Sequence, residues 1–155
     1  MTGRQSGFSL VEVTLALGIA AFCLLVVVAL LPAGILSIRD SAEATASLSF
    51  SQAVLADLRA TGASTNATNS ARFQVSIPPA GTAAPATNTL FFSAGGVTNS
   101  AAAARYRMTV TLTPPTNSAS RQGTLVHIRT TWPAAAAVTN APGAIETFGV
   151  LDRNN

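Results

Sequence analysis

The clearest pattern in the sequence is an apolar run near the N-terminus. From Phe8 to Ile38 almost every residue is apolar, and the 26-residue stretch from Val13 to Ile38 has only two polar interruptions, Thr14 and Ser37. As a helix this stretch would be roughly 39 Å long, at about 1.5 Å per residue. That length exceeds the ~30 Å hydrocarbon core of a bilayer. Because no other segment is long and apolar enough to span, the sequence predicts a single-pass membrane protein.

A helical period continues beyond the apolar run. Apolar residues recur at spacings of three, four or seven positions, and most polar residues fall off this stripe. The apolar positions of the stripe are Ala44, Leu48, Leu55 and Leu58. Gly62 is expected to end the helix near Thr61, as glycine commonly does. The pattern therefore predicts one helix from about Phe8 to Thr61, whose second half is amphipathic and needs a partner surface.

Beyond Gly62 the composition changes to Ala, Thr, Ser, Asn, Gly and Pro, and short stretches of strand character stand within it. The clearest runs from Tyr106 to Thr113, where apolar and polar residues alternate strictly. The stretches Gly95–Ala104 and Ala134–Gly143 are predicted to be loops. The predicted strands are Arg72–Ile77, Thr89–Ser93, Tyr106–Thr113, Thr124–Trp132 and Ile145–Leu151.

One long helix followed by four or five strands predicts the α+β class. The strands should form a small antiparallel sheet packed on the C-terminal half of the helix. The residues expected in the core are Val110, Leu112, Val126, Ile128, Trp132 and Phe148 from the sheet, with Leu48, Leu55 and Leu58 from the helix.

A short polar leader, residues 1–7, precedes the apolar run, and Arg4 indicates that the leader stays on the cytoplasmic side. Glu12 is a lone carboxylate near the start of the run. An ionised carboxylate at membrane depth is costly unless it is paired, so Glu12 is a candidate functional residue. The pattern from Gly7 and Phe8 to Glu12, followed by apolar residues, resembles the N-terminus of type IV prepilins and type II secretion pseudopilins.

In that family a dedicated peptidase cuts after the glycine, the new N-terminal residue is methylated, and the acid guides assembly. The resemblance implies cleavage between Gly7 and Phe8, N-methylation of Phe8 and an assembly role for Glu12. It divides the chain into a leader (1–7), a transmembrane and assembly helix (8–38) and a periplasmic, pilin-like α+β domain (39–155). The implied setting is a bacterial inner membrane, with the chain built into a periplasmic or cell-surface filament.

Pro32 interrupts the predicted helix, and Gly34 follows two residues later. A proline inside a helix removes one backbone hydrogen bond, costs about 3 kcal/mol and usually produces a kink. Pilin-like proteins often carry a helix breaker in this part of the segment. Two interpretations stay open: the pair is a hinge at which the helix loosens during assembly, or a tolerated kink near the membrane surface.

The alternating strand, the Trp132-Pro133 ending and the C-terminal strand resemble minor pseudopilins more than major ones. The N-terminal run and the end from Glu146 to Arg153 also resemble the prepilin-like Verru_Chthon cassette protein B family. These resemblances imply a minor pilin or pseudopilin of a type IV pilus-like or type II secretion-like filament. Its implied partners are other pilin or pseudopilin subunits, the prepilin peptidase and an inner-membrane assembly platform.

The sequence shows no catalytic constellation, and its charge says little about its partners. The formal net charge is +3, but the nine basic residues, all arginines, are scattered. Arg105 and Arg107 would share one face of a strand, which favours a solvated sheet face over a nucleic-acid contact. The single histidine, His127, rules out a zinc site built on histidines within one chain. Cys23 is the only cysteine, so no intrachain disulfide forms. We expect no enzyme activity, no metal and no cofactor.

Two rival functions fit the same sequence. The first is a single-pass anchored domain that binds a ligand or surface glycan and never assembles. The second is an initiating subunit of a DNA-uptake pilus. Dependence on a peptidase separates the first rival from a filament subunit, because a plain anchor needs no cut after Gly7.

Overall fold

The computed structural model describes residues 7–62, 67–79, 84–93, 95–115 and 123–152. The chain divides into two compact units, Met1–Ser41 and Ala42–Asn155. Within the described residues a long helix precedes five strands. The elements are α1 (Leu10–Gly62), β1 (Ala86–Ser93), β2 (Gly96–Thr98), β3 (Tyr106–Thr113), β4 (Thr124–Trp132) and β5 (Gly143–Leu151).

Helix α1 starts at Leu10, and the carbonyl of Ser9 closes its first turn. This carbonyl accepts hydrogen bonds from the backbone N–H of Glu12 at 3.0 Å and of Val13 at 3.2 Å. The helix continues through Pro32 to Gly62 without a break. The predicted helix is therefore confirmed, with its start two residues later and its end one residue later than expected.

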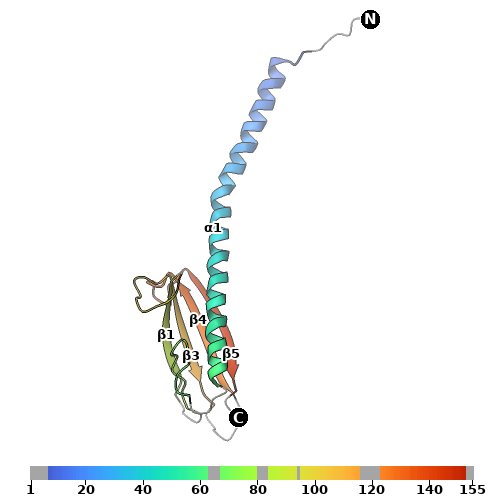
Figure 1. Cartoon of the computed structure of the whole chain (residues 1–155). Coiled ribbons are helices and arrows are strands. Elements are labelled where there is room, and N and C mark those ends of the chain that lie inside the picture. Colours follow the sequence, from blue (N-terminus) through green and yellow to red (C-terminus); the bar gives the residue numbers. More distant parts are fainter. Residues whose placement is uncertain (1–6, 63–66, 80–83, 94, 116–122, 153–155) are drawn as a thin grey trace. The chain divides into compact units, whose positions relative to one another are not determined.

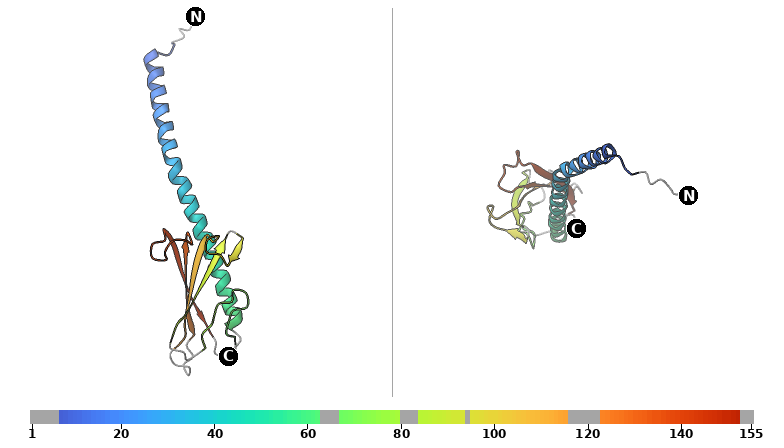
Figure 2. Two further views of the ribbon diagram at one scale, coloured as in Figure 1. Left: turned by 90° about the vertical axis from the view of Figure 1, so that its left-hand side faces the viewer. Right: turned by 90° about the horizontal axis from the view of Figure 1, so that it is seen from above.

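All strand pairs are antiparallel, and the strands lie in the order β2-β1-β3-β4-β5. The C-terminal part of α1 lies along one face of this sheet, as Figures 1 and 2 show from different sides. The predicted α+β arrangement, an antiparallel sheet packed on the C-terminal half of a long helix, is confirmed.

Four of the predicted strands are confirmed. Tyr106–Thr113 and Thr124–Trp132 have the predicted bounds, while Thr89–Ser93 and Ile145–Leu151 form the larger parts of β1 and β5. The expected loop from Gly95 is partly wrong, because β2 lies within it and pairs with the end of β1. A strand of three residues is too short to show a period of its own.

The predicted strand Arg72–Ile77 is wrong. It has no strand ladder, and a single isolated bridge joins its Ser76 to Asn69. Yet Phe73, Val75 and Ile77 are buried while the residues between them are exposed. The alternation in the sequence therefore reported burial correctly but strand pairing wrongly.

Side chains supply the hydrogen bonds that a strand partner would give to this segment. Both carboxylate oxygens of Asp57 accept from the backbone N–H of Arg72 at 3.2 Å, and Oδ2 also accepts from that of Phe73 at 3.0 Å. The side-chain amide of Asn88 accepts from the N–H of Ser76 at 3.1 Å and donates to its carbonyl at 3.2 Å. One residue of α1 and one of β1 thus hold the segment against the core.

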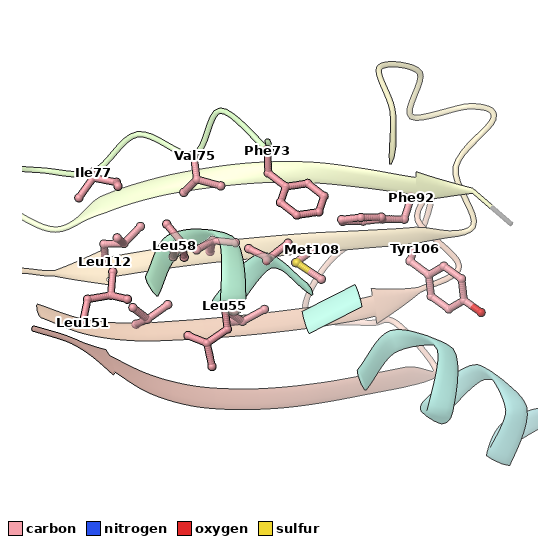
Figure 3. Packing of buried hydrophobic residues seen from close by; sticks show 14 residues of the cluster. Leu55, Leu58, Phe73, Val75, Ile77, Phe92, Tyr106, Met108, Leu112 and Leu151 are labelled. Atoms are coloured by element: carbon pink, nitrogen blue, oxygen red, sulfur yellow. The ribbon is translucent and has the colours of Figure 1, made fainter. Parts of the chain in front are cut away.

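The hydrophobic core lies between α1 and the sheet, and Figure 3 shows side chains from both layers and from the 73–77 segment meeting there. The buried helix residues follow one stripe that includes Ser47 and Ser51, and the Ser51 hydroxyl lies 3.3 Å from that of Thr130 on β4. The core residues are Val54, Leu55, Leu58, Phe73, Val75, Ile77, Phe92, Tyr106, Met108, Val110, Leu112, Val126, Ile128 and Leu151.

Two residues that the sequence placed in the core are not in it. Leu48 is 43% exposed, because the buried stripe of α1 passes through its neighbour Ser47. Phe148 is 62% exposed, because the register of β5 pairs it with His127 on the face of the sheet away from the core. Trp132 is half-buried and packs against the edge of the core.

Candidate functional site

The candidate site lies at the start of α1, in the first compact unit. Gly7, Phe8 and Ser9 precede the helix, and Glu12 lies in its first turn. A carboxylate there is favoured by the partial positive charge of the helix N-terminus. Ser9 and Glu12 also have the Ser-x-x-Glu spacing of a capping box, which is a structural reason for an acid at this position.

Phe8, just before α1, and Glu12, in its first turn, line the same hollow. Together with Val13, Ala16, Leu17 and Ala20 they line an open hollow of about 540 Å³ on the helix surface. Glu12 is the only charged residue of this lining, and the described residues give its carboxylate no ion pair. The structure thus brings together the residue expected to become the mature N-terminus and the acid expected to guide assembly.

Every described residue from Gly7 to Ser41 is exposed in the isolated chain. The large apolar side chains among them range from 41% to 83% exposed. Soluble monomers rarely expose so much contiguous apolar surface. By its length and composition, α1 is long and apolar enough to cross a membrane.

The single chain leaves room for a side chain at both Gly7 and Gly34. A Cβ added at either position would meet no atom within 4 Å, and neither glycine has a positive φ. The fold of the isolated chain would therefore accept a side chain at both positions. Any requirement for glycine there lies outside the folding of the single chain.

The predicted hinge residues, Pro32 and Gly34, both lie inside α1 in an exposed stretch. The leader residues 1–6 fall outside the described part of the chain, so the proposed cleavage site is described only from Gly7 onward.

A second polar cluster, which sequence reasoning missed, ties α1 to the sheet in the second unit. Arg105, just before β3, forms an ion pair with Glu43, and its Nε donates to Glu43 Oε2 at 3.1 Å. This hydrogen bond, more than any other effect, holds the pKa of Glu43 below its ordinary value. Burial, followed by the charge of Glu43, raises the pKa of Tyr106. No spacing signal links residues 62 positions apart, so only the fold could reveal the pair.

Arg105 and Arg107 therefore do not form the shared basic face that the sequence suggested. Arg105 reaches Glu43 on α1, whereas the guanidinium of Arg107 lies over the Phe91 ring, 5.8 Å from its centroid.

The Glu43 pair should make the second unit more stable at neutral than at acid pH. A carboxyl with a folded-state pKa below its unfolded value stabilises above about pH 4.5, and this contribution is lost as the pH falls through the folded pKa. We expect Glu43→Gln to lower the free energy of unfolding by about 1 kcal/mol or less at pH 7, since Arg105 is largely exposed. The difference from wild type should shrink as the pH falls below about 4.5 and through the folded-state pKa of Glu43.

Denaturant titration of the full chain in a neutral detergent, followed by the fluorescence of its single tryptophan, measures this difference. Asp40→Asn, an exposed acid three residues earlier on α1, is the matched control and should change little at either pH. A Glu43→Gln effect that persists unchanged at low pH would show that the ion pair is not its cause.

The only histidine belongs to the exposed face of the sheet. The His127 ring stacks on Phe148 with centroids 4.6 Å apart, and its Nε2 lies 3.3 Å from Glu146 Oε2. Arg129 Nε lies 3.6 Å from the other oxygen of Glu146. Among the described residues, no group of three or more His, Cys, Asp or Glu side chains could hold a metal ion.

Searches against protein-family models, curated proteins and solved structures found no match for this chain.

Proposed function

We propose that the chain is a minor pilin or pseudopilin, a structural subunit of a type IV pilus-like or type II secretion-like filament. A prepilin peptidase would cut it between Gly7 and Phe8, and Phe8 would then be N-methylated. Glu12 would guide its assembly from the inner membrane. The partners in this proposal are other pilin or pseudopilin subunits, the peptidase and an inner-membrane assembly platform.

The observation that carries the proposal is the unpaired carboxylate of Glu12, which lies beside Phe8 on an otherwise apolar helix surface. Glu12 is the only charged residue between Arg4 and Arg39. In a bilayer such a charge needs a partner, and the described residues of the chain itself supply none. A neighbouring subunit with a newly freed N-terminal ammonium would supply one.

A second observation concerns the exposed apolar surface of the first unit. The first unit exposes its apolar residues on all sides of the helix, so lipid alone could cover it before assembly. Inside a filament, helices of neighbouring subunits would cover the same surface. The Pro32 and Gly34 pair lies in this stretch and would be the place where the helix loosens as it leaves the bilayer.

A substitution at Gly7 tests the peptidase step, because the fold of the chain leaves room for a side chain there. In the native host we expect Gly7→Val to abolish processing, so that the unprocessed chain accumulates in the membrane. A β-branched side chain next to the scissile bond should keep the backbone out of a narrow, membrane-embedded protease site. The intact mass of the membrane-extracted chain measures the processed fraction.

Gly3→Val is the matched control, since it makes the same change within the leader but away from the cut. It should be processed like wild type. Processing of Gly7→Val to the same extent as wild type would contradict cleavage after Gly7.

A further inference from the structure

Beyond filament assembly, we infer that the second unit binds an extended acidic peptide segment of a partner protein, in a hollow at the open edge of β1. The hollow has a volume of about 400 Å³ and lies between the 72–74 segment and the end of β2. It is lined by Arg72, Phe73, Gln74, Thr89, Leu90, Phe91, Val97, Thr98 and Asn99.

The first observation is an interrupted sheet edge. On this side of β1, β2 pairs only with Phe91, Phe92 and Ser93. Thr89 and Leu90, which line the hollow, have no strand partner here among the described residues. The backbone of an edge strand is a template for an extended peptide, which adds to the sheet by main-chain hydrogen bonds.

The second observation is uncompensated positive charge. Arg72 lines the hollow with its guanidinium over the Phe73 ring, and Arg107, which is not part of the lining, lies over the ring of the lining residue Phe91. Among the described residues neither arginine makes an ion pair, and Arg107 Nε is buried with no hydrogen-bond partner. A guanidinium binds a carboxylate well because its planar donors match the two oxygens.

The acidic residues of the chain do not neutralise this place. There are six, all within the described residues, and none lines the hollow. Glu43 and Glu146 pair with other basic groups. The Asp57 carboxylate accepts the backbone N–H groups of Arg72 and Phe73 but forms no ion pair with the Arg72 guanidinium. The missing carboxylate would therefore come from the ligand.

The remaining lining suits a peptide. Gln74 and Asn99 carry amides, Thr89 and Thr98 carry hydroxyls, and Val97 is half-exposed. Gln74 has a φ of 53°, a left-handed conformation that costs a non-glycine residue free energy and that clusters at ligand sites. Its side chain donates to the carbonyl of Ala71 at 3.1 Å, which helps to fix this turn at the rim.

The test uses the full chain in a neutral detergent and a fluorescent, end-blocked hexapeptide of alternating Val and Glu. We expect saturable binding that weakens about tenfold, or about 1.4 kcal/mol, when Gln replaces Glu in the peptide. Arg72→Gln and Arg107→Gln should each weaken it by a similar factor. Arg59→Gln removes the same charge from an exposed position outside the lining and should leave binding unchanged. N-methylation of alternate peptide groups should also weaken binding, because it removes main-chain donors.

Three results would overturn the proposal. One is equal binding of the Glu and Gln peptides, and another is binding that ignores both arginine variants. The third is no binding of the peptide together with arginine-dependent binding of a single-stranded oligothymidine, which would assign the hollow to nucleic acid.

Discussion

Replacing Glu12 with Gln should leave cleavage and membrane insertion intact but remove the chain from its assembled complex. The change keeps the size of the side chain and removes its charge. We expect the fraction of mature chain that co-sediments with the complex, after mild detergent extraction, to fall by at least about tenfold. Truncating one partner of a desolvated, hydrogen-bonded charge pair costs about 2–5 kcal/mol, which is more than enough for that loss.

The physical reason is the position of Glu12 in the apolar helix. After cleavage, the ammonium of Phe8 in one subunit can pair with the carboxylate of Glu12 in its neighbour, and methylation keeps that positive charge. Pairing removes much of the desolvation penalty. It also fixes the axial register between helices, because a shifted register leaves a bare charge in an apolar environment.

Asp40→Asn is the control for Glu12→Gln, since it removes a carboxylate from the same helix just beyond the apolar run. It should assemble normally. If the Glu12→Gln variant assembled as well as wild type, the capping role offered by Ser9 and Glu12 would be sufficient to explain the acid.

In the same assay Pro32→Ala should be cut and inserted normally but incorporated less. Unchanged incorporation would make Pro32 a tolerated kink.

Gly143→Ala should destabilise the second unit by about 3 kcal/mol, near the upper end of the usual cost of overpacking. A Cβ at Gly143 would clash with Cε2 and Nε1 of the Trp132 ring. An indole ring is rigid, and this one also contacts the Tyr106 ring edge-on, with centroids 6.2 Å apart. The ring therefore cannot give way without disturbing the ends of both β4 and β3.

Trp132 is the only tryptophan, so its fluorescence during denaturant unfolding of the full chain reports on this contact directly. Gly95→Ala is the control, because a Cβ there meets its nearest atom at an ordinary 3.8 Å and φ is not positive. It should change the free energy of unfolding by no more than about 1 kcal/mol. Equal stabilities of the two variants would mean that the β5 backbone is not packed on the Trp132 ring.

The sequence predicted the elements well where periodicity and pairing coincide. The alternation of apolar and polar residues predicted the observed bounds of β3 and β4. The helical stripe predicted α1 and two of its core residues, Leu55 and Leu58. The prediction of a strand at Arg72–Ile77 failed because alternation reports which side chains are buried. It does not report whether another strand or the side chains of Asp57 and Asn88 complete the backbone hydrogen bonds.

The errors in the core have a related cause. Phe148 was assigned by hydrophobicity alone, although Leu151 and Ile145 on the same strand have the opposite parity and one of them, Leu151, is buried. Leu48 was preferred to Ser47 for the same reason, yet a small hydroxyl allows the helix to approach the sheet. The candidate site at Gly7, Phe8 and Glu12 was inferred from a local pattern that resembles prepilins, and it stays a prediction. The Glu43–Arg105 pair and the hollow beside β1 depend on residues far apart in sequence, which no local pattern could bring together.

Processing of the chain as a prepilin is tested most directly by the intact mass and N-terminal peptide of the chain extracted from the membrane of its native host. We expect a chain that begins at Phe8 and carries one additional methyl group on its N-terminal nitrogen. A chain that still begins at Met1, or one cut after the apolar run near Thr45, would contradict it.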